Sequence, residues 1–129
     1  MSVGVPTDRK YLETHEWHKL EGRTVTIGIT QFAADELTDI TYVELPEVGT
    51  AVRAGKRFGE IESVKATADL MCGVTGTIVA VNTRLADEPG LINDDPFAAG
   101  WMIKVQSADP SEFEKLLSAE AYDQQIAKD

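Results

Sequence analysis

The chain has 129 residues, enough for a single domain over 1–129 that buries about two thirds of its unfolded surface. Asp and Glu number 22 against 12 Lys and Arg, which gives a formal net charge of −10. Because phosphate groups attract clusters of Lys and Arg, this balance argues against binding to nucleic acid or to anionic membranes. The apolar stretches are far shorter than the roughly 18 residues that span a bilayer, so we expect no membrane segment.

The cysteine content and the first residues bear on the compartment. Cys72 is the only cysteine, so it cannot form an internal disulfide and is expected to be a small buried core residue. Residues 1–10 contain neither an apolar signal core nor an Arg- and Ser-rich amphipathic run. These features predict a cytoplasmic protein.

The first half of the chain alternates short strand and helix signals. Residues 24–30 alternate β-branched and small residues with period two, which predicts a half-buried strand. Residues 31–37 suit a short helix that Thr30 can cap, and 40–45 form a second strand that Pro46 ends.

The second half of the chain is expected to form several more short strands and then to become helical. Further extended segments are predicted within 51–64, at 67–72, at 77–81 and at 102–105, with a turn cluster at 87–90. Asp109, Pro110 and Glu112 are spaced as in a capping box, with Pro in the first turn. Tyr122 and Ile126 continue an apolar face, which suggests a second short helix. Many short strands punctuated by glycine predict an antiparallel sandwich or barrel.

Candidate catalytic or metal-binding groups are few. His15 and His18 are three residues apart beside extended sequence, so they do not match the zinc motif whose histidines are four apart on a helix. Glu60 and Glu62 share one strand face and could form an acid/base pair, although an exposed charged edge explains them better. We therefore expect no metal site and no catalytic centre.

Lys65 is the residue that calls for a functional interpretation. It lies between two strand-like runs, within the segment 59–70, and would occupy the tip of a hairpin. Most lysines in such a place are plain surface residues. A rigid hairpin could also present the flexible stem and nucleophilic amine of lysine for acylation by a ligase.

Several motifs in order give the sequence a family resemblance over about 11–122. They are HEW at 15–17, VTIGIT at 25–30, DITYVELPEVGT at 39–50, ESVKA at 62–66, GT at 76–77, VN at 81–82, LINDDPF at 91–97 and GWMIK at 100–104. Together they resemble the glycine cleavage system H protein family of lipoyl carriers. One departure is Thr38, where the family usually has glycine.

The resemblance implies a fold and marks two glycines. The implied architecture is mainly β, a lipoyl-domain-like flattened β-barrel and sandwich hybrid with short flanking helices. Its lipoyl-like core would cover about 24–106, followed by a C-terminal helical extension over 109–127. Gly49 and Gly76 match the glycines that lie sixteen residues before and eleven residues after the lysine in the wider lipoyl-domain pattern. Both are expected to be turn residues, where glycine accepts positive φ.

The resemblance also implies a carrier rather than an enzyme. Lipoate would be joined to Lys65 through an amide, and the arm would carry the aminomethyl group left by glycine decarboxylation. The implied partners are a pyridoxal-phosphate glycine decarboxylase, a folate-dependent aminomethyltransferase, dihydrolipoyl dehydrogenase and lipoate-attaching enzymes.

Three acidic residues are candidates for supporting roles. Glu62 matches an acidic residue of the family three positions before the lysine and could help a basic ligase surface to orient it. Glu16 and Asp69 lie in family-like motifs and could hold the cationic loaded arm near the protein. Ordinary solvated carboxylates are the simpler interpretation of both.

Other functions remain open. A lipoyl relay that donates lipoate to 2-oxoacid dehydrogenases would have the same sequence features. A biotin carrier has the same hairpin plan but typically places methionines beside its lysine, whereas Val64 and Ala66 stand here. An unmodified interaction module is disfavoured by the intact 62–66 segment, and an enzyme by the missing catalytic constellation.

Overall fold

The fold consists mainly of strands, as the sequence predicts. The computed structural model describes residues 5–127. The strands are β1 (Lys10–Tyr11), β2 (Glu16–Glu21), β3 (Thr24–Ile29), β4 (Ile40–Glu44), β5 (Ala51–Val52), β6 (Lys56–Ser63), β7 (Thr67–Cys72), β8 (Gly76–Val81) and β9 (Ile103–Ser107). The helices are α1 (Gln31–Leu37), α2 (Arg84–Asp87), α3 (Leu91–Asp94), α4 (Pro110–Glu114) and α5 (Ala119–Ala127). Within 5–127, no helix is long and apolar enough to cross a membrane.

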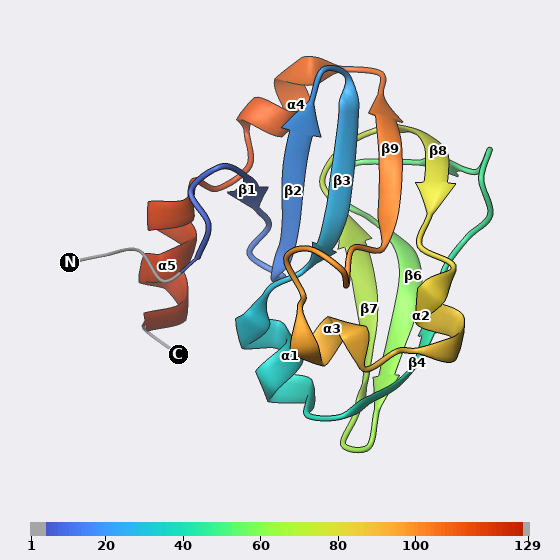
Figure 1. The fold of residues 1–129 in the computed structure, drawn as a ribbon. Helices are drawn as coiled ribbons and strands as arrows, with labels where there is room; N and C mark the ends of the chain where they lie inside the picture. The colour runs from blue at the N-terminus through green and yellow to red at the C-terminus, as the bar shows by residue number, and fades with distance from the viewer. Residues whose placement is uncertain (1–4, 128–129) are drawn as a thin grey trace.

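Two antiparallel sheets face each other without closing into a barrel. One has the strand order β1-β2-β3-β9-β8-β5 and the other has the order β4-β6-β7 (Figure 1). The expected sandwich hybrid with short helices is therefore confirmed in this open form. Strand β2 lies before the expected core range of 24–106, yet it pairs with β3 along its whole length.

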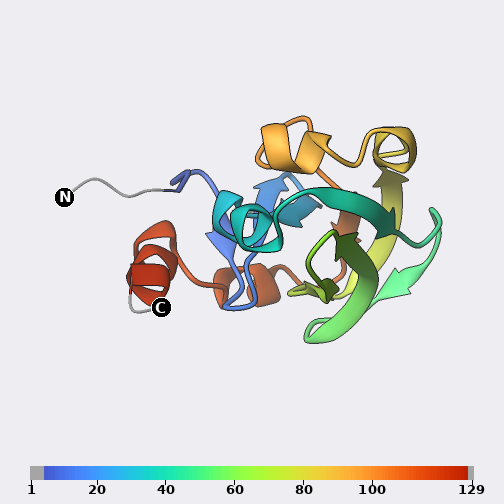
Figure 2. The same cartoon turned by 90° about the horizontal axis from the view of Figure 1, so that it is seen from below.

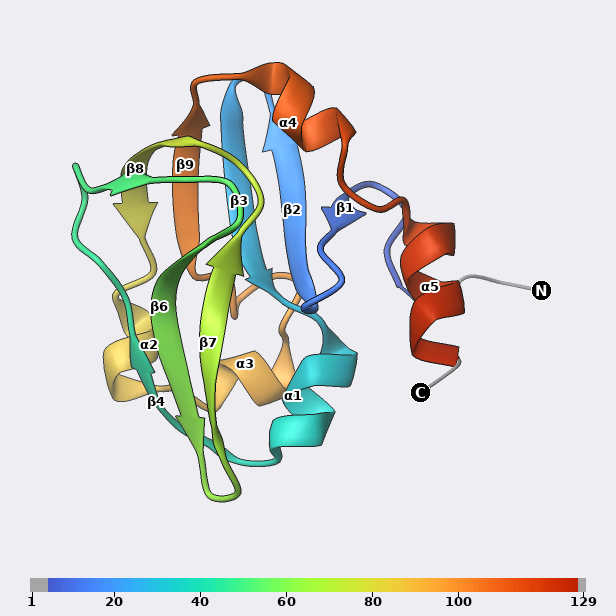
Figure 3. The same cartoon turned by 180° about the vertical axis from the view of Figure 1, so that it is seen from behind.

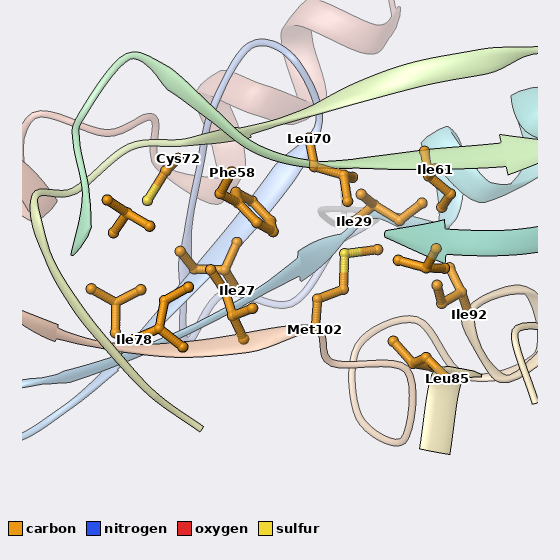
Figure 4. Close-up of a cluster of buried hydrophobic side chains, with 14 of the residues drawn as sticks. Ile27, Ile29, Phe58, Ile61, Leu70, Cys72, Ile78, Leu85, Ile92 and Met102 are labelled. Atoms are coloured by element: carbon orange, nitrogen blue, oxygen red, sulfur yellow. The ribbon is translucent and has the colours of Figure 1, made fainter. Parts of the chain in front are cut away.

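The core fills the space between the two sheets. Close to the centre lie Ile27 and Ile29 from β3, Phe58 and Ile61 from β6, and Leu70 from β7 (Figure 4). The strand 24–30 was expected to be half-buried, but five residues of β3 from Val25 to Ile29 are buried. The reason is that β3 is a central strand whose second face is also covered. Trp17 lies over Gly28 there, and a Cβ atom on Gly28 would meet the indole at 2.7 Å.

The expected helix starts are confirmed, with one correction. Thr30 caps α1 by accepting a hydrogen bond from the Ala33 N–H at 3.3 Å. Asp109 caps α4 by accepting from the Ser111 N–H at 3.0 Å. Glu112 does not complete the capping box. Its carboxylate instead accepts the backbone N–H and the hydroxyl of Thr75, at 2.7 and 2.8 Å, which ties α4 to the loop before β8.

The C-terminal helix lies at one end of the molecule, beyond β1 (Figures 2 and 3). It is seated on a second, smaller core of Val5, Tyr11, Trp17, Ala119 and Tyr122. Tyr11 connects this core to the sheet, because its N–H and C=O both bond to Leu117 at 2.8 Å. The expected second helix around 122–126 is therefore present and packed.

Candidate lipoyl-lysine hairpin and arm cleft

The hairpin between β6 and β7 presents Lys65 at its tip. The hairpin projects beyond the neighbouring helices at the lower edge of Figure 1. The turn is closed by the Ser63 N–H, which donates to the Ala66 carbonyl at 2.8 Å. The Ser63 hydroxyl accepts the N–H groups of Lys65 and Ala66 at 3.1 and 3.0 Å. These bonds make the turn a defined platform for an exposed lysine.

The tip is also tied to the segment that follows α1. The Val64 N–H donates to the Asp39 carbonyl at 3.0 Å, while the Val64 side chain remains 69% exposed. The Lys65 ammonium donates to the backbone carbonyl of Glu36 at 3.3 Å. Lys65 is therefore exposed, yet its amine lies against the C-terminal half of α1.

A cleft of about 430 Å³ begins at this place and runs beside edge strand β7. Its walls come from three parts of the chain: the segment before and into β2, the end of β3 with α1, and strands β6 and β7. The lining residues are Thr14, His15, Glu16, Ile29, Phe32, Ala33, Glu36, Leu37, Ile61, Ala68, Asp69 and Leu70. Glu36 belongs both to this lining and to the contact with Lys65. A side chain extended from the Lys65 amine would therefore start at the rim of a mostly apolar cleft.

Glu16 is the buried carboxylate of the cleft. Its side chain accepts the Met71 N–H at 3.0 Å and the Thr14 hydroxyl. Glu16 is only 1% exposed, and burial away from water raises the pKa of its carboxyl to about 7. The simpler expectation of a solvated carboxylate is thus wrong for Glu16, because it begins a buried strand and faces the edge of β7.

Asp69 borders the same cleft in a different environment. Its side chain is 65% exposed and pairs with the Arg57 guanidinium at 3.1 Å. The Arg57 guanidinium also lies 3.1 Å from Glu60 and 3.5 Å from Glu44. The register places Glu44 opposite Glu60 and Glu60 opposite Asp69, so one arginine contacts a row of three carboxylates. The structure brings Glu16 and Asp69 to one cleft, but only Glu16 is buried.

Glu62 lies outside the cleft, near the tip of the hairpin. It is exposed and stands between Tyr42 and Thr67 in neighbouring strands. Its backbone carbonyl accepts the Thr41 hydroxyl at 3.3 Å. The carboxylate is therefore presented on the outer face of the hairpin, where a partner protein could reach it.

The two glycines that flank the lysine serve different structural needs. Gly49 has φ of +95°, as a turn glycine should. Gly76 was expected to have positive φ as well, but it is the first residue of β8 and pairs with Val52 and Ser107. A Cβ atom there would lie 2.0 Å from the Gln106 carbonyl oxygen. Gly76 is thus needed for close approach of two strands, and the turn interpretation was wrong.

Comparison with known proteins decides the family. The family model described as glycine cleavage H-protein matches residues 9–129. The chain belongs to the glycine cleavage H-protein family. It is 53% identical over 126 residues to a probable glycine cleavage system H protein of Haloarcula marismortui, covering 98% of this chain and 99% of the relative.

Further relatives agree along the full length. A glycine cleavage system H protein of Bacillus mycoides is 48% identical over 127 residues, covering 98% of this chain and all of the relative. The crystal structure of an H protein from Mycobacterium marinum superposes with a TM-score of 0.87 at 40% identity, covering 95% of this chain and 99% of that one. Family membership makes the chain a lipoyl carrier of the glycine cleavage system, and neither the relay nor the biotin alternative is favoured.

Although His15 belongs to the HEW motif, nothing in the sequence shows that it lines the cleft. His15 adopts φ of +81°, and its ring lies 5.0 Å from that of Phe32 on α1. His18, three residues later, is buried in β2, where its Nε2 atom accepts the Gly73 N–H at 3.0 Å. Burial lowers the pKa of His18 to about 4. The two histidines therefore have separate structural surroundings. Among residues 5–127, no group of three potential metal ligands comes together.

Proposed function

We propose that Lys65 is the attachment site of the lipoyl group and that the arm folds back into the cleft beside it. One observation carries the proposal: the exposed amine of Lys65 lies 3.3 Å from the backbone carbonyl of Glu36, which is itself part of the cleft wall. An acyl chain on this amine can therefore reach the apolar lining without any rearrangement of the fold.

The residues present fit a lipoyl arm. The hairpin tip has no bulky side chain that would block a ligase, since Val64 and Ala66 flank the lysine. The cleft offers apolar side chains from α1 and from the facing strands, which suit the aliphatic part of the arm. When attached, lipoate would supply a disulfide whose S–S bond breaks as one sulfur takes the aminomethyl group of glycine and the other sulfur becomes a thiol, while the decarboxylase releases CO₂.

Glu16 supplies the electrostatic part of the proposal. An aminomethyl group on the arm is cationic at neutral pH, and a buried carboxylate in the cleft attracts such a cation more strongly than an exposed carboxylate does. Its two hydrogen bonds, from Met71 and Thr14, leave its position fixed. Asp69 can add a weaker attraction at the rim, because it is shared with Arg57 and screened by water.

The chain itself acts as a non-catalytic carrier subunit in this account. Glycine decarboxylase would load the arm, a folate-dependent aminomethyltransferase would unload it, and dihydrolipoyl dehydrogenase would reoxidise the dithiol by thiol–disulfide exchange. A lipoate-attaching enzyme would modify Lys65, with Glu62 as its orienting contact. We further propose that the chain forms one domain with a lipoyl core and a packed C-terminal extension, which limited proteolysis would test. We also propose that it is located in the cytoplasm, which cell fractionation would test.

Loading by the decarboxylase tests the proposed function. The lipoylated chain is incubated with a glycine decarboxylase and glycine, and intact mass records the aminomethyl adduct. We expect one adduct on the wild type and on Lys56→Arg, an exposed lysine of β6 that serves as the control. Lys65→Arg should show none. An adduct on Lys65→Arg, or its absence from the lipoylated wild type, would contradict the proposal.

A further inference from the structure

A tyrosine of the C-terminal helix is joined to two walls of the arm cleft. The Tyr122 hydroxyl on α5 lies 2.7 Å from His15 Nδ1 and 2.7 Å from the Thr30 hydroxyl. Its two partners lie 107 and 92 residues away along the chain. One hydroxyl group therefore connects the segment before β2, the start of α1 and the C-terminal extension.

Both partners of Tyr122 hold parts of the cleft. His15 lines the cleft next to Glu16, and its φ of +81° is a conformation that non-glycine residues seldom adopt. Thr30 is the N-cap of α1, the helix that supplies Phe32, Ala33, Glu36 and Leu37 to the opposite wall. The Thr30 N–H also donates to the His15 carbonyl at 3.0 Å. The two walls thus meet at His15 and Thr30, and Tyr122 bonds to both side chains at that junction.

The position of the Tyr122 hydroxyl is fixed by the packing of its ring. Tyr122 is fully buried, and its ring stacks on Tyr11 at a centroid distance of 4.8 Å and an angle of 16°. Tyr11 is in turn bonded through its backbone to Leu117, just before α5. Both rings belong to the second core on which α5 packs, so close packing holds the hydroxyl in place.

We infer that Tyr122 is a positioning residue whose hydroxyl sets the geometry of the arm cleft and so governs how long a loaded arm stays shielded. The inference rests on the proposed function. The Tyr122 hydroxyl lies behind the cleft wall and fixes the strained backbone of His15. Because Glu16 follows His15 directly, this contact also fixes where Glu16 enters β2. Without the hydroxyl, His15 and Thr30 each lose one buried partner, and the two walls can move apart.

Tyr11 provides a matched control for the test. Tyr122→Phe and Tyr11→Phe each remove one hydroxyl from the same stacked pair of rings. The Tyr11 hydroxyl donates to the Pro6 carbonyl at 2.5 Å, away from the cleft. If weaker packing of the two rings caused the faster release, both variants would show it. If the changed geometry of the cleft caused it, only Tyr122→Phe would show it.

The first measurement is the ¹⁵N spectrum of the imidazole rings in the unmodified protein. The chain has two histidines, so the buried His18 serves as an internal reference. We expect Tyr122→Phe to shift the His15 resonances and to leave those of His18 in place, with Tyr11→Phe changing neither. Unchanged His15 resonances in Tyr122→Phe would overturn the inference whether or not the arm is shielded.

The second measurement is the rate at which the loaded carrier loses its aminomethyl group in the absence of partner enzymes. We expect Tyr122→Phe to release it about fivefold faster than the wild type, the factor that one net buried hydrogen bond is worth. Equal acceleration by Tyr11→Phe, or a wild-type rate in Tyr122→Phe, would overturn the inference. If the wild type releases the aminomethyl group as fast as a short lipoyl-lysine peptide does, the cleft does not shield the arm. That result would contradict the proposed function and, with it, this inference.

If Tyr122→Phe has a much lower melting temperature than Tyr11→Phe, variants of Thr30 provide a second test, because Thr30 is the other partner of the Tyr122 hydroxyl. Thr30→Ser keeps the hydroxyl that contacts Tyr122 and caps α1, and Thr30→Val removes both contacts. We expect Thr30→Val to reproduce the fast release and the His15 shift, and Thr30→Ser to behave as the wild type. The same release from both variants would overturn the inference.

Discussion

Glu16 accepts a hydrogen bond from the backbone N–H of Met71 at 3.0 Å, which fixes the carboxylate at the start of β2 to the free edge of β7. The bond joins the two sheets at the cleft. It also holds an ionisable group where burial raises its pKa to about 7. Burial therefore disfavours the ionised carboxylate, and a cationic ligand in the cleft would offset part of that cost.

The first prediction concerns stability and pH. The folded protein keeps the proton of Glu16 to a higher pH than the unfolded chain does. The contribution of Glu16 to the free energy of unfolding therefore falls as pH rises from about 4.5 to about 7. The pKa change corresponds to about 3 kcal/mol over that window. His18 acts in the opposite sense, since its lowered pKa costs stability as pH falls from 6.5 to about 4. Glu16→Gln should therefore gain stability relative to the wild type as pH rises.

Urea unfolding at pH 4.5 and pH 8 measures this difference. Glu13→Gln is the control, because Glu13 is exposed in the same segment. It should track the wild type at both pH values. A Glu16→Gln effect that does not change with pH would show that Glu16 is not a buried titrating group.

The second prediction concerns the loaded arm. Glu16→Gln should speed the loss of the aminomethyl group about fivefold, because an attraction of about 1 kcal/mol changes the closed-to-open ratio by that factor. Asp69→Asn should have a smaller effect that fades with added salt, since Asp69 is exposed and paired with Arg57.

Glu60→Gln is the matched control for Asp69→Asn. It removes another carboxylate from the same arginine, but Glu60 does not line the cleft. Release is followed as formaldehyde and ammonia over time. Wild-type release rates in both single variants and in the double variant would remove Glu16 and Asp69 from the account.

Much of the fold can be predicted from local sequence signals. Thr30 before α1 and the β-branched alternation of β3 are visible without any tertiary information, because capping and period-two patterns are local. The capping interpretation of Glu112 failed because the carboxylate had a better partner in Thr75, 37 residues away. Gly76 looked like a turn glycine because nothing in the sequence reveals the nearby Gln106 carbonyl.

The candidate site also has one part that the sequence predicts and other parts that it does not. The exposed Lys65 tip follows from the order of strands and turns. The burial of Glu16, the pairing of Asp69 with Arg57 and the contact between His15 and Tyr122 depend on residues distant in sequence. No local pattern distinguishes a buried glutamate from a solvated one at the start of a strand. For this reason Glu16 and Asp69 seemed equivalent in the sequence, although their surroundings differ.

The third prediction concerns Thr38, which stands where the family usually has glycine. Thr38 ends α1 with φ of +61° and ψ of −147°, a region that is favourable only for glycine. Thr38→Gly should raise the free energy of unfolding by about 1 kcal/mol by relieving this strain. Thr38→Ala should not, because it keeps a Cβ atom. Chemical denaturation of the three proteins tests this, and equal stability of the Gly and Ala variants would contradict it.

The fourth prediction concerns recognition by the lipoate-attaching enzyme. Glu62→Gln should lower the lipoylation rate, because an exposed carboxylate beside the lysine favours encounter with a basic surface. Its melting temperature should match the wild type. Glu47→Gln, an exposed acid in the loop before β5, should be lipoylated at the normal rate. Parallel losses of rate and stability in Glu62→Gln would instead indicate a structural role.

Peptide mapping by mass spectrometry shows directly whether Lys65 carries the lipoyl group. The chain is expressed in cells with an active lipoate ligase, as wild type and as Lys65→Arg, and digested for mapping. We predict one lipoyl amide on the peptide that contains Lys65, no modification of the variant, and similar melting of both, since exposed substitutions cost within about ±0.5 kcal/mol. A lipoyl group on any other lysine, a biotinyl group on Lys65, or an unmodified wild type would contradict it.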